Sequence, residues 1–172
     1  KIHFVVEEAC EGLSGVSSSQ IEMNANIQFY DGMTTKDIQN VLVRSANDLI
    51  SLDTPNYQYA AARLLSYDVR KEAHGQYEYT PLLKLILRNI RSGVYDKAIL
   101  EKYTKTEIKK FNTWIKRERD LKFTYAGLRQ ICDKYLVQDR SSGQIYETPQ
   151  DMYMMIAATL FADYPTKTRM SY

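Results

Sequence analysis

The sequence predicts a mainly α-helical protein made of two small domains. Apolar residues recur at helical spacing along almost the whole chain. Most of these periodic segments open on Ser, Thr or Asp, which cap helix N-termini, and several of them close at glycine. The alternating pattern of a β-strand is confined to short runs on either side of Gly143. Together these features favour packed helices and leave room for only one β-hairpin.

The first three helices are expected over residues 1–11, 19–29 and 36–52. Gly12 is a suitable stop for the first helix. Ser18 or Ser19 is expected to cap the second helix, which breaks at the turn dipeptide Asp31-Gly32. Thr34 or Thr35 is then expected to cap the third helix.

A long fourth helix is expected over residues 53–78. Asp53 or Thr54 can cap its start, and Pro55 suits a first turn, where a missing N–H group costs nothing. Lys71 suits the negative end of the helix dipole, and Gly75 can end the helix in a left-handed conformation. Its apolar stripe consists of Tyr57, Ala60, Ala61, Leu64, Leu65 and Tyr67. The four helices form a short bundle, which would gain from a covering sheet that the sequence does not contain.

The second half is also helical. Thr80-Pro81 is expected to open a helix to residue 91 that is apolar almost all round and therefore buried between neighbours. Two shorter helices follow over 96–103 and 106–115, and the charge run 116–122 is expected to be a solvated helix end. A helix over 123–134 leads to a hairpin that turns at Gly143. Thr148-Pro149 is expected to cap a last helix over 150–162, whose methionines are expected to fill the core.

Composition excludes several classes of protein. The 172 residues carry a formal net charge of +2, and basic residues are interleaved with acidic ones, so nucleic-acid binding is not indicated. No apolar run is long enough to span a membrane, and the first residues do not resemble a signal peptide. A cytoplasmic protein is the simplest expectation. Cys10 and Cys132 lack the spacing of metal ligands and are expected to be reduced and inert.

Catalytic chemistry is absent from the sequence patterns. There is no glycine-rich phosphate loop and no cluster of histidines and carboxylates, so neither a catalytic residue nor a metal ligand is predicted. His3 and His74 are far apart in the sequence, and nothing pairs them with each other; isolated histidines of this kind are expected at the surface or as helix caps. A binding site for phosphate is more plausible, because Lys1, the Thr34/Thr35 cap and Lys71 place cations and a hydroxyl at helix ends. The alternative is that these residues are ordinary caps and end charges.

Several strings of residues carry a family resemblance. They are DTPNYQYAAARL and RKEAHGQYE in the fourth helix, IQFYDGMTT at 27–35, RERDLKF at 117–123, KYLVQ at 134–138 and GQIYE at 143–147. In this order they resemble the N-terminal region of the large subunit of class I ribonucleotide reductase, over nearly the whole chain. The resemblance implies an ATP-cone over residues 1–75, without its first strands, and the start of the large subunit's helical region over 76–172, before the catalytic barrel.

The ATP-cone of this family binds ATP or dATP, with magnesium, as an allosteric effector. The resemblance places Lys1, Thr35, Gln39 and Lys71 at positions that hold the nucleotide. Gln39 stands where many relatives have histidine, and a neutral amide can form hydrogen bonds but cannot take a positive charge.

The whole family enzyme reduces ribonucleoside diphosphates to deoxyribonucleoside diphosphates for DNA synthesis. The resemblance implies as partners a small, metal-containing subunit that supplies a radical, and further copies of the large subunit. Without the barrel, this segment is expected to be inactive by itself. The alternative hypothesis is a stand-alone helical interaction module that binds no nucleotide and presents its methionines to a partner.

Overall fold

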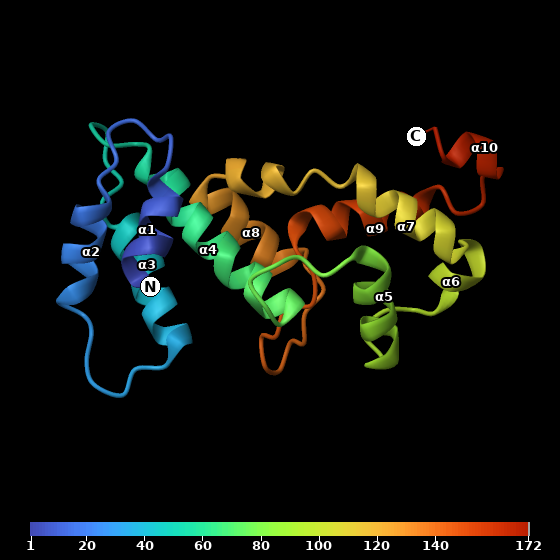
Figure 1. Ribbon diagram of the computed structural model, residues 1–172, viewed down its shortest axis with the longest axis horizontal. Coiled ribbons are helices and arrows are strands. Elements are labelled where there is room, and N and C mark those ends of the chain that lie inside the picture. Colours follow the sequence, from blue (N-terminus) through green and yellow to red (C-terminus); the bar gives the residue numbers. More distant parts are fainter. Residues whose placement is uncertain (172) are drawn as a thin grey trace. The chain divides into compact units, whose positions relative to one another are not determined.

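The computed structural model describes residues 1–171, and within them helices predominate, as predicted (Figure 1). Contacts divide the chain into two units. The first unit comprises residues 1–69 and 118–135, and the second comprises residues 70–117 and 136–172. Because units of contact are not the same as domains, the predicted division between residues 75 and 76 stays a prediction.

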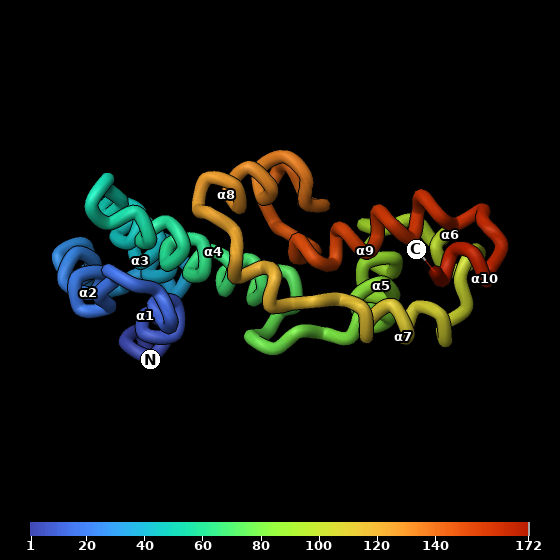
Figure 2. Tube along the Cα trace, turned by 90° about the horizontal axis from the view of Figure 1, so that it is seen from above, coloured from blue at the N-terminus to red at the C-terminus, as the bar shows by residue number. Residues whose placement is uncertain are grey.

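The first unit contains three short helices at its N-terminal end, α1 (Ile2–Cys10), α2 (Ser18–Asn26) and α3 (Thr35–Asn47). Helix α2 contacts both α1 and α3, and the three lie side by side in both views (Figure 2). The first part of α4 (Tyr57–His74) and α8 (Tyr125–Lys134) complete the unit. The predicted bundle therefore forms, and a helix from the second half of the sequence joins it.

Local capping chemistry sets the start of these helices. Thr34, rather than Thr35, is the N-cap of α3; its hydroxyl accepts the Asp37 N–H, and the Asp37 carboxylate accepts the Thr34 N–H. Helix α2 is capped by Ser17, one residue before the predicted Ser18 or Ser19. Each cap satisfies a backbone donor that the helix itself leaves unpaired.

Helix α4 is shorter than predicted and begins at Tyr57. Neither Asp53 nor Thr54 lies next to its first residue, and the Thr54 hydroxyl donates to Leu49 O at 2.8 Å. Gly75 follows its last residue with φ +71°, the left-handed conformation expected of a glycine that ends a helix.

The apolar stripe predicted for α4 is buried. Its members Tyr57, Ala60, Ala61, Leu64, Leu65 and Tyr67 all belong to the core. On the same helix, Arg63 Nη1 donates to Ala9 O at 3.1 Å and to Glu11 O at 2.6 Å. These bonds satisfy carbonyls at the end of α1, where the helix provides no partner, and thereby tie α1 to α4.

The second unit contains five further helices: α5 (Leu82–Arg91), α6 (Ala98–Lys102), α7 (Lys105–Trp114), α9 (Pro149–Leu160) and α10 (Thr166–Arg169). Their core contains Leu82, Ile86, Ile99, Tyr103, Ile108, Phe111 and Ala158. Met154 and Met155 of α9 pack against this core, and Met152 is buried. The prediction that the methionines fill the core is confirmed.

Helix α5 differs from its prediction in two ways. Pro81 occupies the N-cap position, Thr80 does not cap the helix, and the Leu82 N–H donates to Asn112 Oδ1 of α7 at 2.8 Å. Helix α5 is also not buried on all sides, because Leu83 and Leu87 are only half-buried and Lys84 and Arg91 are exposed. The helix is rich in apolar residues, but these residues do not cover all of its sides.

The charge run and the hairpin are both present, in forms that differ from their predictions. The charge run forms a 3₁₀ helix, η1 (Arg117–Lys122). Glu118, Arg119 and Lys122 are exposed, as expected of a solvated helix end, but Asp120 is buried. The predicted hairpin is present as one antiparallel bridge between Gln138 and Ile145, with Gly143 at φ +74° in its turn. None of the helices in residues 1–171 has the length and apolar character that crossing a membrane requires.

Candidate functional site

The N-terminus of α3 presents the hydroxyl predicted to hold a phosphate. Thr35 is the first residue of the helix and is exposed, and within residues 1–171 neither its hydroxyl nor its N–H has a partner. The adjacent Thr34 is occupied, since its hydroxyl donates to Asp37 Oδ2 at 2.6 Å. Asp37 lies two residues beyond Thr35, on the opposite side of the helix. An anion could therefore approach on the Thr35 side, away from this carboxylate.

Gln39 lies one turn beyond Thr35 on α3, as its spacing predicts. Its side chain is half-buried, and Nε2 donates to Leu64 O of α4 at 2.7 Å. This bond fixes the amide group and links α3 to α4. The Oε1 atom remains as an acceptor, so Gln39 could receive a hydrogen bond but holds one of its donors in the fold.

Lys1 and Lys71 are exposed cations. Lys1 precedes α1, and its carbonyl accepts the Val5 N–H at 3.2 Å. Lys71 is in the last turn of α4 and belongs to the second unit, whereas the other three predicted residues belong to the first. Within residues 1–171, no hydrogen bond or ion pair joins Lys1, Thr35 and Gln39 to one another. The nucleotide site assigned to these four residues therefore stays a prediction.

Each histidine has a carboxylate partner that the sequence did not indicate. His3 is exposed, as expected, but its Nδ1 lies 2.7 Å from Glu22 Oε1 and its Nε2 lies 3.2 Å from Glu7 Oε1. The hydrogen bond with Glu22, together with the charge of Glu7, raises the pKa of His3. His74 is only 4% exposed and lies in the interior of the second unit.

A buried polar network surrounds His74. The Thr80 N–H donates to His74 Nδ1 at 3.2 Å, which leaves the ring proton on Nε2, 3.4 Å from Asp151 Oδ2. Asp151 is fully buried and also binds Arg117 Nη1 at 2.7 Å and the Thr148 hydroxyl at 2.7 Å. Burial by itself raises the pKa of Asp151, but contact with His74 and the charge of Arg117 outweigh it, and the pKa lies below its usual range.

A second buried carboxylate lies next to this network. Glu147 accepts the Tyr95 hydroxyl through Oε2 and the Val137 N–H through Oε1 at 3.0 Å. Burial raises the pKa of Glu147 despite these two bonds, and burial beside Glu147 likewise raises the pKa of Tyr95. Sequence reasoning missed both carboxylates because Tyr95 lies 52 residues from Glu147 in the chain and His74 lies 77 residues from Asp151.

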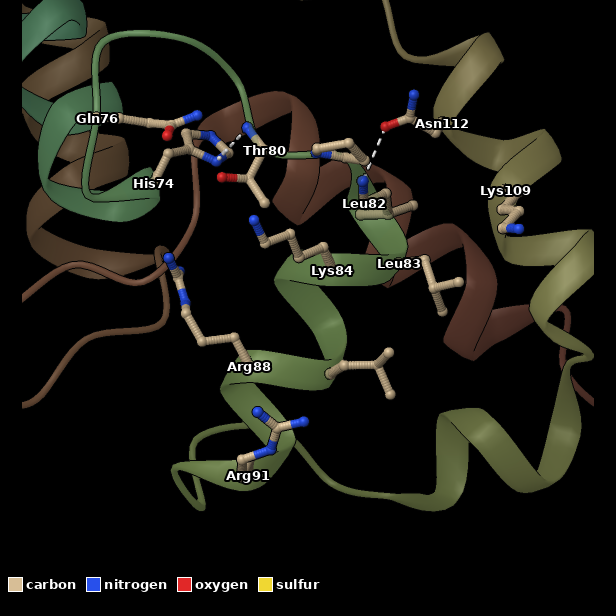
Figure 3. Close-up of a pocket in the computed structure, with 12 residues that line it drawn as sticks. His74, Gln76, Thr80, Leu82, Leu83, Lys84, Arg88, Arg91, Lys109 and Asn112 are labelled. Atoms are coloured by element: carbon tan, nitrogen blue, oxygen red, sulfur yellow. Dashed lines mark hydrogen bonds between the residues drawn. The ribbon is translucent and has the colours of Figure 1, made fainter.

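A basic pocket of about 700 Å³ lies between α5, α7 and the loop after α4 (Figure 3). Its cations are Lys84, Arg88, Arg91 and Lys109, and no Asp or Glu lines it. The spacing of the three α5 cations was the available sequence signal. By contrast, a pocket of about 570 Å³ beside α1 is acidic, lined by Glu7, Glu8 and Glu11, and is unsuited to a phosphate. Within residues 1–171, no group of side chains could hold a metal ion.

Comparison with known proteins decides the family. The model of the ribonucleotide reductase all-alpha domain matches residues 121–172. Over all 172 residues, the chain is 47% identical to the ribonucleoside-diphosphate reductase 1 subunit alpha of Escherichia coli (strain K12). It is 44% identical over the same length to the subunit alpha of Haemophilus influenzae, and 44% identical over 167 residues to that of Enterobacteria phage T4. The chain belongs to the ribonucleotide reductase large-subunit family.

The match to the large-subunit family covers only part of its members. The chain spans 23% of the length of the E. coli and H. influenzae subunits and 22% of the phage subunit. The helical architecture agrees with the all-alpha domain of the family model. Within residues 1–171, neither Cys10 nor Cys132 forms a disulfide. Burial raises the pKa of Cys10 to about 11, so this thiol is unreactive near neutral pH.

Proposed function

We propose that the chain is the regulatory segment of a ribonucleoside-diphosphate reductase large subunit and that it binds ATP or dATP, with magnesium, as an allosteric effector. The observation that carries this proposal is the full-length identity of 44–47% to large subunits. The accessible Thr35 at the start of α3 supports it further.

In this proposal the triphosphate lies at the N-terminus of α3. The free N–H groups of the first turn and the Thr35 hydroxyl donate to phosphate oxygens, and Lys1 and Lys71 supply positive charge. Gln39 forms a hydrogen bond with the nucleotide through Oε1 while its Nε2 remains bound to Leu64 O. Because glutamine is neutral, its part in the site does not change with pH, as that of a histidine would.

The reaction itself belongs to the whole protein in this proposal. The complete large subunit, working with a small metal-containing subunit that supplies a radical, would reduce ribonucleoside diphosphates to deoxyribonucleoside diphosphates in the cytoplasm. Effector binding would alter the association of large subunits. The segment over residues 1–172 would take no chemical step, because it contains neither a candidate catalytic residue nor, within residues 1–171, a metal site.

The alternative proposal, a stand-alone helical interaction module, rested in part on the Met-rich last helix. That reading requires exposed methionines along α9 to line a groove for a partner. Met152 is instead buried, and Met154 and Met155 pack against the core of the second unit. The methionines are therefore occupied within the fold.

The test is titration of the complete large subunit with ATP and with dATP, measured by calorimetry. We expect Lys71→Ala and Thr35→Val each to weaken effector binding about tenfold, since each removes one contact to the triphosphate. Lys134→Ala is the matched control, because Lys134 is also an exposed lysine in the last turn of a helix. Circular dichroism confirms that each variant is folded. Unchanged affinity in Lys71→Ala and Thr35→Val would remove these residues from the site.

A further inference from the structure

The basic pocket of the second unit is not explained by the proposed effector site. Its lining comes from α5, α7 and residues 74–81, whereas Thr35 and Gln39 belong to the first unit (Figure 3). Its volume of about 700 Å³ is that of a small-molecule site. The pocket is therefore a separate candidate for a ligand.

Three of its cations form a row on α5. Lys84, Arg88 and Arg91 follow one another at intervals of four and three residues, so they share one face of the helix. Neighbouring side chains in such a row start about 5–6 Å apart. Lys109 lines the pocket from α7. The row thus places three positive charges along one face of α5, at the lining of the pocket.

These charges are not neutralised within the fold. Within residues 1–171, none of the ion pairs involves Lys84, Arg88, Arg91 or Lys109, and no carboxylate lines the pocket. Four like charges around one hollow repel one another, which an anion would relieve.

One cation of the row is held in place by the protein. Arg88 Nη2 donates to Ala73 O in the last turn of α4, and Arg88 Nε donates to Asn89 Oδ1 at 3.2 Å. These bonds leave the two N–H groups of Nη1 without a partner in residues 1–171, on a side chain that is already immobilised. A fixed guanidinium with free donors loses little entropy when it binds an oxyanion.

The remaining surface of the pocket is apolar. Leu83 and Leu87 are half-buried and lie on α5 next to the cationic row. Asn112 already accepts the Leu82 N–H through Oδ1, and its Nδ2 is a further donor. Donors are thus grouped beside an apolar wall, which suits an anion attached to an organic group.

We propose that this pocket binds a small organic polyphosphate, with its phosphates on Lys84, Arg88 and Arg91 and its organic part against Leu83 and Leu87. The volume favours a small molecule over an acidic peptide, and the closely spaced cations match the charge density of linked phosphates. This assignment does not depend on the proposed effector site.

Inorganic tripolyphosphate is the probe that isolates the phosphate part. We expect calorimetric titration of the 172-residue chain at low ionic strength to show binding that weakens as salt is added. Lys84→Ala and Arg91→Ala should each reduce the affinity about tenfold, and the double variant more than either. Both side chains are exposed, so neither substitution disturbs the core.

Controls separate this pocket from other sites. Lys105→Ala removes an exposed lysine of α7 that does not line the pocket, and it should leave the affinity unchanged. Lys71→Ala should leave the backbone NMR shifts that tripolyphosphate causes in α5 unchanged, even where it weakens binding at the proposed effector site. Backbone NMR should show shifts in α5 and in residues 109–112 on addition of tripolyphosphate.

Three results would overturn the proposal. The first is no binding of tripolyphosphate at low ionic strength. The second is binding that Lys105→Ala weakens as much as Lys84→Ala does. The third is a stronger response to a hexaglutamate peptide than to tripolyphosphate, which would identify the pocket as a site for an acidic peptide.

Discussion

Replacement of Asp151 by alanine should strongly destabilise the second unit. The carboxylate is fully buried, accepts the Thr148 hydroxyl and forms an ion pair with Arg117. Breaking a buried ion pair by removing one partner costs about 3–5 kcal/mol, because the other charge is left uncompensated. Losing the Asp151 contacts at the N-cap of α9 adds about 1 kcal/mol.

The environment of Arg117 lowers the cost of breaking its ion pair with Asp151. The Arg117 side chain is 18% exposed, its Nη1 lies 3.2 Å from Thr148 Oγ1, and its guanidinium stacks on Tyr79 at 4.5 Å. These contacts and some access to water remain in the variant, so breaking the ion pair should cost about 3 kcal/mol, the lower end of the range for buried pairs. We therefore expect Asp151→Ala to cost about 3–4 kcal/mol of the free energy of unfolding. Asp151→Asn, which keeps an acceptor oxygen, should cost about 1–2 kcal/mol.

Urea unfolding followed by tryptophan fluorescence is the suitable measurement. The chain contains one tryptophan, Trp114, on α7 of the second unit, so the signal reports on the unit that carries Asp151. Asp163→Ala is the matched control, because Asp163 pairs with Lys102 but its side chain is 83% exposed. An exposed pair contributes less than about 1 kcal/mol. Equal losses in Asp151→Ala and Asp163→Ala would refute the reasoning.

The pH dependence of the same variant gives an independent check. The pKa of Asp151 is lowered in the folded protein, so its contribution to stability is complete above its ordinary value of 3.8. As pH falls through the folded-state pKa, the carboxylate is protonated and the contribution disappears. The difference between the wild-type chain and Asp151→Ala should therefore shrink below about pH 3.8 and stay constant between pH 5 and 7.

Two further predictions concern Glu147 and Gly75. The pKa of Glu147 is raised, so its contribution to stability is present below pH 4.5 and is lost as pH rises through the folded-state pKa. In Glu147→Gln the free energy of unfolding should therefore depend less on pH above pH 4.5. An unchanged pH dependence in urea titrations would contradict this. Gly75→Ala should lower thermal stability by about 1 kcal/mol, since φ is +71° and an added Cβ meets no atom within 4 Å. Gly75→Asn should lose less, because asparagine tolerates this conformation, and equal losses in scanning calorimetry would contradict the argument.

Predictions that rest on neighbouring residues agree with the structure. The Thr34 cap depends on Asp37, three residues away, and the end of α4 depends on Gly75 alone. Both are decided by backbone donors and dihedral angles within one turn of helix, so the sequence contains all the necessary information. The same holds for Thr148 before α9. The error at Ser17 is a choice among three adjacent serines that offer the same hydroxyl.

The environment of a polar side chain could not be predicted in this way. His74 and Asp151 are 77 residues apart, so nothing local indicates that His74 is buried against a carboxylate. The partner of Gln39 could not be predicted either, because its hydrogen bond to Leu64 O joins residues 25 positions apart in the chain. Thr35 is exposed, and its nucleotide contact, like those of Lys1, Gln39 and Lys71, rests on the family resemblance.

The basic pocket could be predicted from the sequence only in part. The row of Lys84, Arg88 and Arg91 can be read from its helical spacing alone. That these charges border a hollow depends on α7 and on the bond from Leu82 N–H to Asn112, 30 residues away. An uncompensated cationic row on an exposed helix face would be solvated and ordinary, whereas the same row beside an apolar wall favours an anionic ligand. The sequence contains the charges, and the packing of α5 on α7 makes them a site.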